Sequence, residues 1–260
     1  KAKAYLKERG LNEELEIGYN GTAWEKMRHS LIFPLKDRSS QIVSFYGRSV
    51  TASNHFYNSN RKGLYPGYPK AETETLILTE SVIDTATLQQ YTNYPVLALY
   101  GTNGLTPEHA EAIKELTELK EIILFLDGDQ AGHEAIKRNG EILQKLKPEI
   151  KLTYIETPEG EDINSLAQSH EPTIFKHLID HRLSVRSETK AGKPLLFSSE
   201  AKPPQSSHRT LSKLNTDNPE LLFYQNCVLN FTVLGGIKIT GLDRLRVTLK
   251  IEHQERNHLL

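Results

Sequence analysis

Four carboxylates stand at the two points where an apolar segment gives way to a helix-like pattern. Glu80 and Asp84 lie in "LILTESVIDTATLQQ", and Asp127 and Asp129 lie in "IILFLDGDQAGHEA". Residues two apart on an extended segment point to the same side, and Gly128 allows a tight turn between the two aspartates. Carboxylates in one place repel one another unless a cation neutralises them, and oxygen-only ligands favour Mg²⁺ or Mn²⁺. The spacing therefore indicates a metal site that completes its shell with water and phosphate.

Each acid pair also has a purely structural explanation. Ser81 is a typical helix N-cap, and Asp84 in the first turn would interact favourably with the helix dipole. An Asp-Gly pair after a strand is often only a turn. The metal interpretation is favoured because both pairs follow strands of the same strand–helix alternation, so their carboxylates can meet.

The elements that position these acids alternate between strands and helices. We predict strands at 75–80, 95–99, 121–126 and 151–155. We predict helices at 82–91, 106–117 and 131–146, with one or two short helices in 162–183. Such repeats favour a parallel sheet with right-handed crossovers, whose sites form at the carboxyl ends of the strands. The predicted fold class is α/β, with a Rossmann-like parallel sheet flanked by helices.

The flanking segments differ from this alternating part, so we predict four segments. Residues 1–74 form a mixed α+β basic subdomain: a short helix ended by Gly10, then a hairpin with strands at 31–35 and 41–46. Residues 75–183 form the α/β domain. Residues 184–218, rich in Pro, Ser and Lys, form a linker. Residues 219–260 form the start of a truncated β-containing region, with strands around a Gly235–Gly236 turn.

Bulk composition excludes several classes of protein. The net charge of −1 means that any nucleic-acid binding must come from a local patch. A single cysteine, Cys227, excludes a disulfide framework and a cysteine-based zinc site within these residues. The sequence contains neither a membrane-length apolar run nor a signal peptide. We therefore expect a cytoplasmic protein that does not bind membranes.

Several motifs together resemble a known family. The segments "LILTESVID", "ALYGTNGLTPEHAEAIKEL" and "ILFLDGDQAGHEA" are similar to the Toprim domain of bacterial DnaG-type primases. Further stretches of that family resemble "RHSLIFPLKDRSSQIVSFYGRSV", "HFYNSNRKGLYPGY" and "TPEGEDINSL" in the same order. The resemblance covers roughly residues 1–180. It implies a catalytic core that makes RNA primers on single-stranded DNA.

The resemblance also implies roles for individual residues. The catalytic residues would be Glu80, Asp127 and Asp129, and the metal ligands would be these three with Asp84 and Asp162. The residues that bind nucleic acid or nucleotide would be Arg48, Asn58, Lys62, His55 and Arg61. The implied cofactor is Mg²⁺ or Mn²⁺, with zinc only in an N-terminal module outside these residues. The implied partners are a single-stranded DNA template and ribonucleoside triphosphates, with a replicative helicase as a candidate.

Three positions depart from the family pattern. Ser81 replaces the usual Gly, His55 replaces a basic residue, and Asn164 replaces the second of two aspartates. Asn164 could still offer an uncharged oxygen to a metal. Two alternatives stay open: a Toprim nuclease or topoisomerase that cleaves DNA, and a nucleic-acid-binding replication module without catalysis. No tyrosine stands in a recognisable topoisomerase signature, and the presence of Glu80, Asp127 and Asp129 argues against a non-catalytic module.

Overall fold

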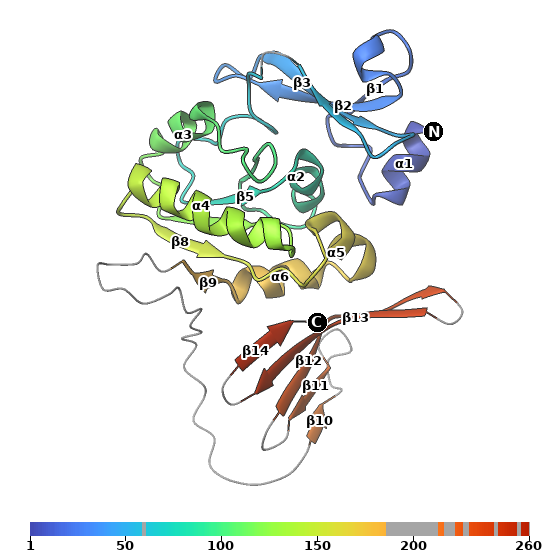
Figure 1. Cartoon of the computed structure of the whole chain (residues 1–260), viewed down its shortest axis with the longest axis vertical. Helices are drawn as coiled ribbons and strands as arrows, with labels where there is room; N and C mark the ends of the chain where they lie inside the picture. Colours follow the sequence, from blue (N-terminus) through green and yellow to red (C-terminus); the bar gives the residue numbers. More distant parts are fainter. Residues whose placement is uncertain are drawn as a thin grey trace.

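Three β-sheets make up the framework of the chain. A computed structural model describes residues 1–58, 61–185, 213–215, 222–225, 229–241, 244–253 and 256–259. In Figure 1 the N-terminal sheet lies at the top, the second sheet with its helices in the middle and the third sheet below. Among the described residues no helix is long and apolar enough to cross a membrane.

The first sheet is antiparallel and has the strand order β1-β2-β3-β4. Its strands are β1 (Gly18–Asn20), β2 (Ser30–Lys36), β3 (Ile42–Ser49) and β4 (His55–Tyr57). Helix α1 (Ala2–Glu8) precedes it and ends before Gly10, whose φ is 63°. A 3₁₀ helix, η1 (Glu25–Met27), lies between β1 and β2. The predicted helix and hairpin are therefore present.

The second sheet has the order β6-β5-β7-β8-β9. Four strands are parallel: β5 (Thr75–Thr79), β6 (Val96–Ala98), β7 (Glu121–Phe125) and β8 (Lys151–Tyr154). The short edge strand β9 (Leu183–Ser184) is antiparallel to β8. The helices are α2 (Val82–Leu88), α3 (Pro107–Lys114), α4 (Gln130–Leu146), α5 (Ile163–Ser169) and α6 (Thr173–Asp180). This arrangement confirms the predicted α/β fold.

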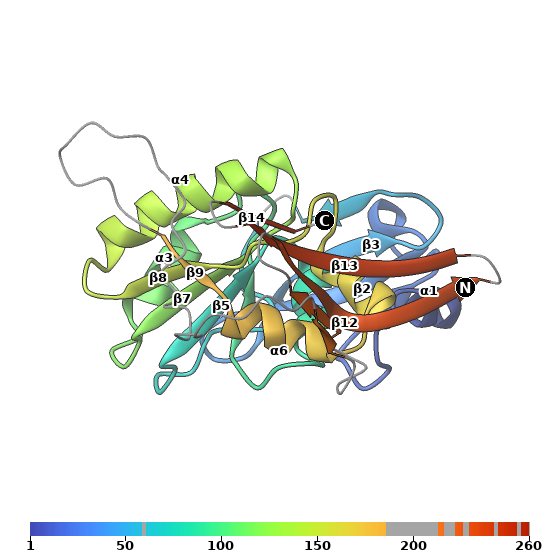
Figure 2. The same ribbon diagram turned by 90° about the horizontal axis from the view of Figure 1, so that it is seen from below.

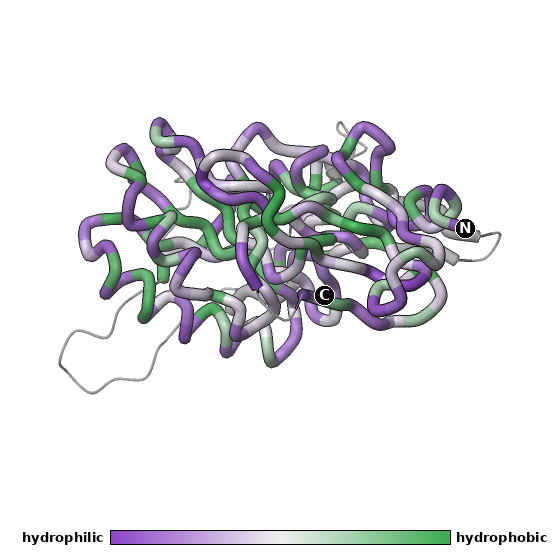
Figure 3. The backbone as a smooth tube through the Cα atoms, turned by 90° about the horizontal axis from the view of Figure 1, so that it is seen from above, coloured by the Kyte–Doolittle hydropathy of each residue, from purple (hydrophilic) through white to green (hydrophobic). Residues whose placement is uncertain are grey.

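The helices cover both faces of the parallel sheet. Leu76 and Leu78 pack with residues of α3 and α4, whereas Ile77 packs on the other face with residues of α2, α5 and α6. In Figure 3 green, hydrophobic stretches run through the centre of the molecule, and purple stretches lie mostly at its periphery. Because β6 and β7 lie on opposite sides of β5, the order of the strands reverses there. In sheets of this kind, ligands bind outside the carboxyl ends of the strands at such a reversal, which here are those of β5 and β7.

The third sheet is an antiparallel meander, β10-β11-β12-β13-β14. Its strands are β10 (Lys213–Asn215), β11 (Phe223–Gln225), β12 (Leu229–Gly241), β13 (Arg244–His253) and β14 (Arg256–Leu259). Figure 2, which is seen from below, shows the long β12–β13 ribbon in front of the molecule, extending from the region of α6 toward α1. Leu234 packs into the core with Phe175, and Thr248 Oγ1 lies 2.5 Å from His170 Nε2. The third sheet is thus attached through α5, α6 and the segment between them.

The predicted Gly235–Gly236 turn is wrong. Strand β12 continues through both glycines, which have φ values of 66° and 68°, and the register with β13 shifts between Leu234 and Lys238. A Cβ at position 235 would lie 2.9 Å from Ile174 Cβ. The glycines therefore form an irregularity that lets β12 pass close to α6, because only glycine tolerates both this φ and this approach.

The boundaries of the four predicted segments stay a prediction. Most of the expected linker, residues 184–218, lies outside the described residues, as does Cys227. Strand β10 begins at Lys213, inside the expected linker, and pairs with β11. The N-terminal side of the third sheet thus starts earlier in the sequence than we predicted.

Candidate active site

The carboxyl ends of β5 and β7 bring the two acid pairs together. Glu80 directly follows β5, and its backbone carbonyl accepts a hydrogen bond from Gly101 N–H at 3.0 Å. Asp127 follows β7 after one residue, and its backbone N–H donates to the Glu80 carboxylate. These contacts fix the Glu80 backbone and side chain at the point where the strand order reverses.

Gly128 in the turn and Gly132 in the first turn of α4 allow the close packing around Asp127 and Asp129. A Cβ on Gly128 would lie 2.0 Å from the Pro158 carbonyl oxygen, and one on Gly132 would lie 2.1 Å from the Asp127 carbonyl oxygen. Gly128 also exchanges backbone hydrogen bonds with the segment 160–161, at 2.9 and 3.0 Å. This close packing therefore needs glycine at both positions.

Five acids lie close enough for their charges to act on one another, and three of them have a raised pKa. Burial, followed by the charges of Asp84 and Asp129, raises the pKa of Glu80 to about 7. Burial and neighbouring carboxylates, including that of Asp162, also raise the pKa of Asp84 and of Asp127. The structure thus gathers all five predicted metal ligands in one cluster, which we call the acid cluster: Glu80, Asp84, Asp127, Asp129 and Asp162.

Three members of the acid cluster also have structural roles. Ser81 caps α2 and donates from its hydroxyl to Asp84 Oδ2 at 2.5 Å. Asp129 caps α4 by accepting from Gly132 N–H at 2.7 Å, and Asp162 caps α5 by accepting from Ser165 N–H at 2.6 Å. The helix caps and the acid cluster are therefore both present and share the same residues. Each cap fixes one carboxylate oxygen and so helps to orient the second.

The acid cluster fits a divalent cation that keeps much of its water. In the described part of the chain, no three His, Cys, Asp or Glu side chains already surround a single metal position. Oε2 of Glu80 is nevertheless buried without a hydrogen-bond partner, and a buried carboxylate that lacks compensation is costly. Mg²⁺ needs only one or two carboxylates, because water and substrate phosphates complete its shell. The residues present therefore suit an oxygen-preferring cation.

Cationic side chains gather around Tyr46 and Tyr57, which pack in one cluster with residues of α2. Arg48 on β3 lies opposite His55 on β4, and the Arg61 guanidinium lies 4.5 Å from the centroid of the Tyr57 ring. Burial first, and then the charges of Arg48 and Arg61, lower the pKa of His55. His55 is therefore mostly neutral near pH 7 and adds little charge, whereas the two arginines are always charged.

Tyr46 connects the cationic residues to the acid cluster. Its ring stacks on His55 with 6.1 Å between ring centroids, and it is only 3% exposed, as expected for a core residue. Burial raises the pKa of Tyr46 to about 12, and the charges of both Arg48 and Asp84 act on its hydroxyl. The charges of one arginine and of one member of the acid cluster thus both act on the Tyr46 hydroxyl.

Known proteins are similar to parts of this chain. Residues 77–167 match the model of a family described as Toprim-like. The DNA primase of Clostridium acetobutylicum is 26% identical over 196 residues, which cover 71% of this chain and 32% of the relative. The DNA primase of Pasteurella multocida is 29% identical over 179 residues, which cover 64% of this chain and 30% of the relative. The chain spans about a third of the length of these relatives.

A solved structure shares the fold. The DnaG primase catalytic domain bound to single-stranded DNA superposes with a TM-score of 0.59 at 20% identity, over 70% of this chain and 72% of that one. The family match includes both acid pairs at the ends of β5 and β7. Residues 77–167 form a Toprim-like domain, and the chain is similar to bacterial DNA primases. This finding confirms the predicted family, and Toprim domains bind divalent metal ions.

Asn164, which replaces an aspartate of the DnaG pattern, joins the Toprim domain to the N-terminal segment. Its Oδ1 accepts from Arg9 at 3.1 Å and from Gln168 at 2.6 Å. Its Nδ2 donates to the Arg9 carbonyl and to Thr87 Oγ1, both at 2.8 Å. The amide oxygen is therefore already bound by two donors, and we assign Asn164 to this junction instead of to the metal site.

Restoring an acid at this position is expected to destabilise the junction. In Asn164→Asp the Arg9 carbonyl and Thr87 lose their donor, and a charge is added next to Asp84, which accepts from the Asn164 backbone N–H. We expect the free energy of unfolding to fall by about 1–3 kcal/mol, measured by urea unfolding. The exposed Asn93→Asp serves as the control. Equal unfolding midpoints for the two variants would contradict the assignment.

The remaining residues that we predicted to bind nucleic acid lie between β4 of the first sheet and β5 of the second sheet. Asn58 is half-buried and Lys62 is exposed, and neither forms a hydrogen bond or ion pair within the described part of the chain. The next residue, Gly63, donates to the Glu108 carboxylate at 2.9 Å, and Tyr100 donates to the Gly63 carbonyl. Sequence reasoning missed Glu108. Its only signal was a first-turn position in a helix, which has no apparent link to residue 63.

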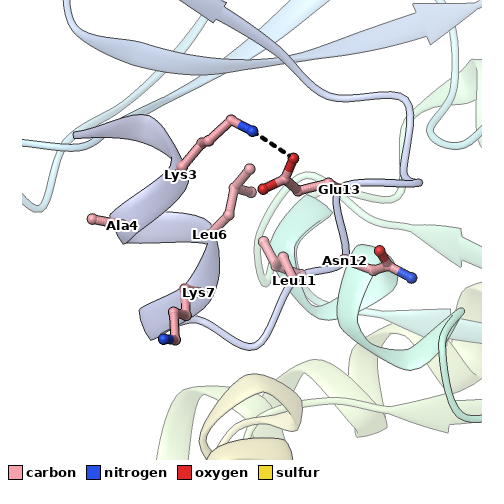
Figure 4. A pocket seen from close by; sticks show the side chains of 7 residues that line it. All are labelled: Lys3, Ala4, Leu6, Lys7, Leu11, Asn12 and Glu13. Atoms are coloured by element: carbon pink, nitrogen blue, oxygen red, sulfur yellow. Dashed lines mark hydrogen bonds and ion pairs between the residues drawn. The ribbon is translucent and has the colours of Figure 1, made fainter.

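A surface hollow at the N-terminus does not belong to this site. Figure 4 shows it between α1 and the segment 11–13, with a volume of about 460 Å³. Its polar lining includes Lys3, whose Nζ lies 2.9 Å from Glu13 Oε2. None of its lining residues belongs to the acid cluster or to the cationic residues near Tyr46.

Proposed function

We propose that the chain is the catalytic core of a DNA primase, which synthesises short RNA primers on a single-stranded DNA template. The observation that carries this proposal is the acid cluster at the reversal of strand order. Primases of this fold bind single-stranded DNA in at least one solved case. The substrates would be ribonucleoside triphosphates, the cofactor Mg²⁺ or Mn²⁺, and a replicative helicase a candidate partner. A cytoplasmic location stays a prediction.

The chain's own residues would position the reactants. Glu80, Asp127 and Asp129 would hold the metal, supported by Asp84 and Asp162. A metal bound there would assist attack of the 3′-hydroxyl and stabilise the leaving pyrophosphate. The Asp127 N–H orients the Glu80 carboxylate before substrate arrives, which reduces the reorganisation needed during reaction. Arg48 and Arg61 would attract phosphates of the template or nucleotide.

A primer-extension assay tests this proposal. The chain is incubated with an RNA primer annealed to a longer DNA strand, labelled ribonucleotides and Mg²⁺ or Mn²⁺. Supplying the primer removes the need for recognition of an initiation sequence. Metal-dependent extension supports the primase assignment. Cleavage of labelled DNA in a parallel reaction would instead support the nuclease or topoisomerase alternative, and binding without either reaction would support the non-catalytic module.

Arg61→Gln is expected to weaken binding of single-stranded DNA. Arg61 is exposed and stacks over Tyr57, so its removal deletes a cation without opening the core. If it neutralises one phosphate, the slope of log affinity against log salt falls by about 0.7. Fluorescence anisotropy at several salt concentrations measures this slope. The exposed Lys26→Gln, on η1, is the control. An unchanged slope in Arg61→Gln would remove this residue from the DNA-binding surface.

A further inference from the structure

Arg138, on α4, connects the helix to the loop beside Glu80. Its guanidinium donates from Nη2 to the backbone carbonyl of Thr102, which is 36 residues earlier in the chain. The side chain is half-buried. Burial has the largest effect on the pKa of Glu80 and raises it, whereas the charge of Arg138 lowers it. Arg138 is therefore a cation of the Toprim side of the site.

The loop that Arg138 contacts is a compact turn fixed to the end of β5. Gly101, with φ of 90°, donates to the Glu80 carbonyl at 3.0 Å, and Gly104 donates to the Gly101 carbonyl at 2.8 Å. A Cβ on Gly104 would lie 2.1 Å from Tyr100 N, so this turn has no space for a larger residue. The loop thus holds the Thr102 carbonyl in a fixed position, which in turn holds the guanidinium.

The guanidinium keeps donors for another acceptor. An arginine carries five N–H donors, and the contact to Thr102 is the hydrogen bond that Arg138 forms within the described part of the chain. A planar guanidinium binds phosphate oxygens in a bidentate manner, and one whose orientation is fixed loses less entropy on binding. A metal-bound triphosphate carries both positive and negative charge. The carboxylates would bind its metal, and the neighbouring guanidinium would bind its phosphate oxygens.

We propose that Arg138 binds the triphosphate of the incoming ribonucleotide, held for this role by the Thr102 carbonyl. The inference rests on the proposed primase function and names a residue for its nucleotide site. A triphosphate is favoured over the DNA backbone because Arg138 binds the loop whose Gly101 N–H donates to the Glu80 carbonyl. The cations suited to a DNA strand, Arg48 and Arg61, belong instead to the first sheet and the segment after it.

Equilibrium binding of a labelled ribonucleoside triphosphate in Mg²⁺ tests the inference without requiring turnover. We expect Arg138→Gln to raise the Kd for the nucleotide about tenfold or more, because charge-assisted bonds to phosphate are lost. Arg138→Lys should give an intermediate value, since it keeps the charge but not the bidentate geometry. The Kd for single-stranded DNA should stay within about twofold. Lys137→Gln, an exposed neighbour on α4, is the control and should bind nucleotide like the wild type.

The outcomes separate the two proposals. If the wild type binds no nucleotide in Mg²⁺ and extends no primer, the primase proposal itself fails. If the wild type binds nucleotide and Arg138→Gln binds it equally well, only the role of Arg138 is wrong. Parallel loss of nucleotide and DNA affinity would assign Arg138 to the DNA backbone and overturn the inference. Thermal melts of the variants identify any that do not fold, and in that case Arg138→Lys provides the comparison.

Discussion

Replacing Asp127 by Asn is expected to slow primer extension by at least ~10²-fold and to leave the metal-free protein as stable as the wild type or more stable. The Asp127 carboxylate is partly buried among other acids, including Glu80 and Asp162. The amide keeps the size of the side chain but not its charge, and the loss of one electrostatic stabiliser typically costs ~10²–10³ in rate. It also removes a like charge from the acid cluster, which relieves repulsion in the folded state.

Two measurements on the same samples distinguish lost chemistry from lost structure. Extension rates are measured in Mg²⁺, and thermal melts are recorded in EDTA. Glu118→Gln, an exposed acid outside the acid cluster, is the control and should leave both measurements unchanged. If Asp127→Asn extends primers within threefold of the wild-type rate at saturating nucleotide and template, the metal is held elsewhere.

The positions of the acids could be predicted from sequence because they depend on local patterns. An apolar run followed by an acid fixes Glu80 after β5 and Asp127 after β7, and parallel strands place both at one edge. Ser81 could be identified as a helix cap for the same reason. The capping and catalytic interpretations looked like alternatives in the sequence. In the structure one cap donates directly to an acid of the cluster, so the two roles depend on each other.

Contacts between distant segments could not be predicted in this way. Arg138 acts on Thr102 and Glu80, and Asn164 joins Arg9 to Thr87, but neither has a local signal that marks its partner. The prediction of a turn at the Gly-Gly pair of β12 was wrong for a related reason. Glycines with positive φ fit a turn as well as an irregular strand, and only the packing against Ile174 decides between them.

Raising the pH of the metal-free protein from about 4.5 to about 8 is expected to lower the part of its free energy of unfolding that depends on the acid cluster. The pKa of Glu80 rises from 4.5 to about 7 on folding, and those of Asp84 and Asp127 rise as well. Across this range the folded state binds more protons than the unfolded state, so the free energy of unfolding falls as pH rises. One pKa unit corresponds to about 1.4 kcal/mol, but Glu80 is partly exposed and solvent screening reduces its share. We expect a total on the order of a few kcal/mol.

Other groups titrate in the same range, so the contribution of the acids must be measured as a difference. Burial lowers the pKa of His177 from 6.5 to about 4, which makes stability rise with pH between those values. The Glu80→Gln variant keeps the contribution of His177 and removes one acid whose pKa is raised. Its free energy of unfolding should therefore fall less than that of the wild type between about pH 4.5 and 7. Parallel pH profiles for the two proteins would contradict the repulsion within the acid cluster.

Adding Mg²⁺ should reverse the destabilisation, and more strongly at high pH than at low pH. A cation binds the deprotonated carboxylates, so its affinity rises as the acids lose their protons. At a metal concentration 100 times the Kd, the folded state gains about 2.7 kcal/mol. The repulsion that lowers stability without metal is thus the same property that favours metal binding. For this reason Glu80→Gln should respond less to Mg²⁺ than the wild type at about pH 8, and an equal response would place the metal away from Glu80.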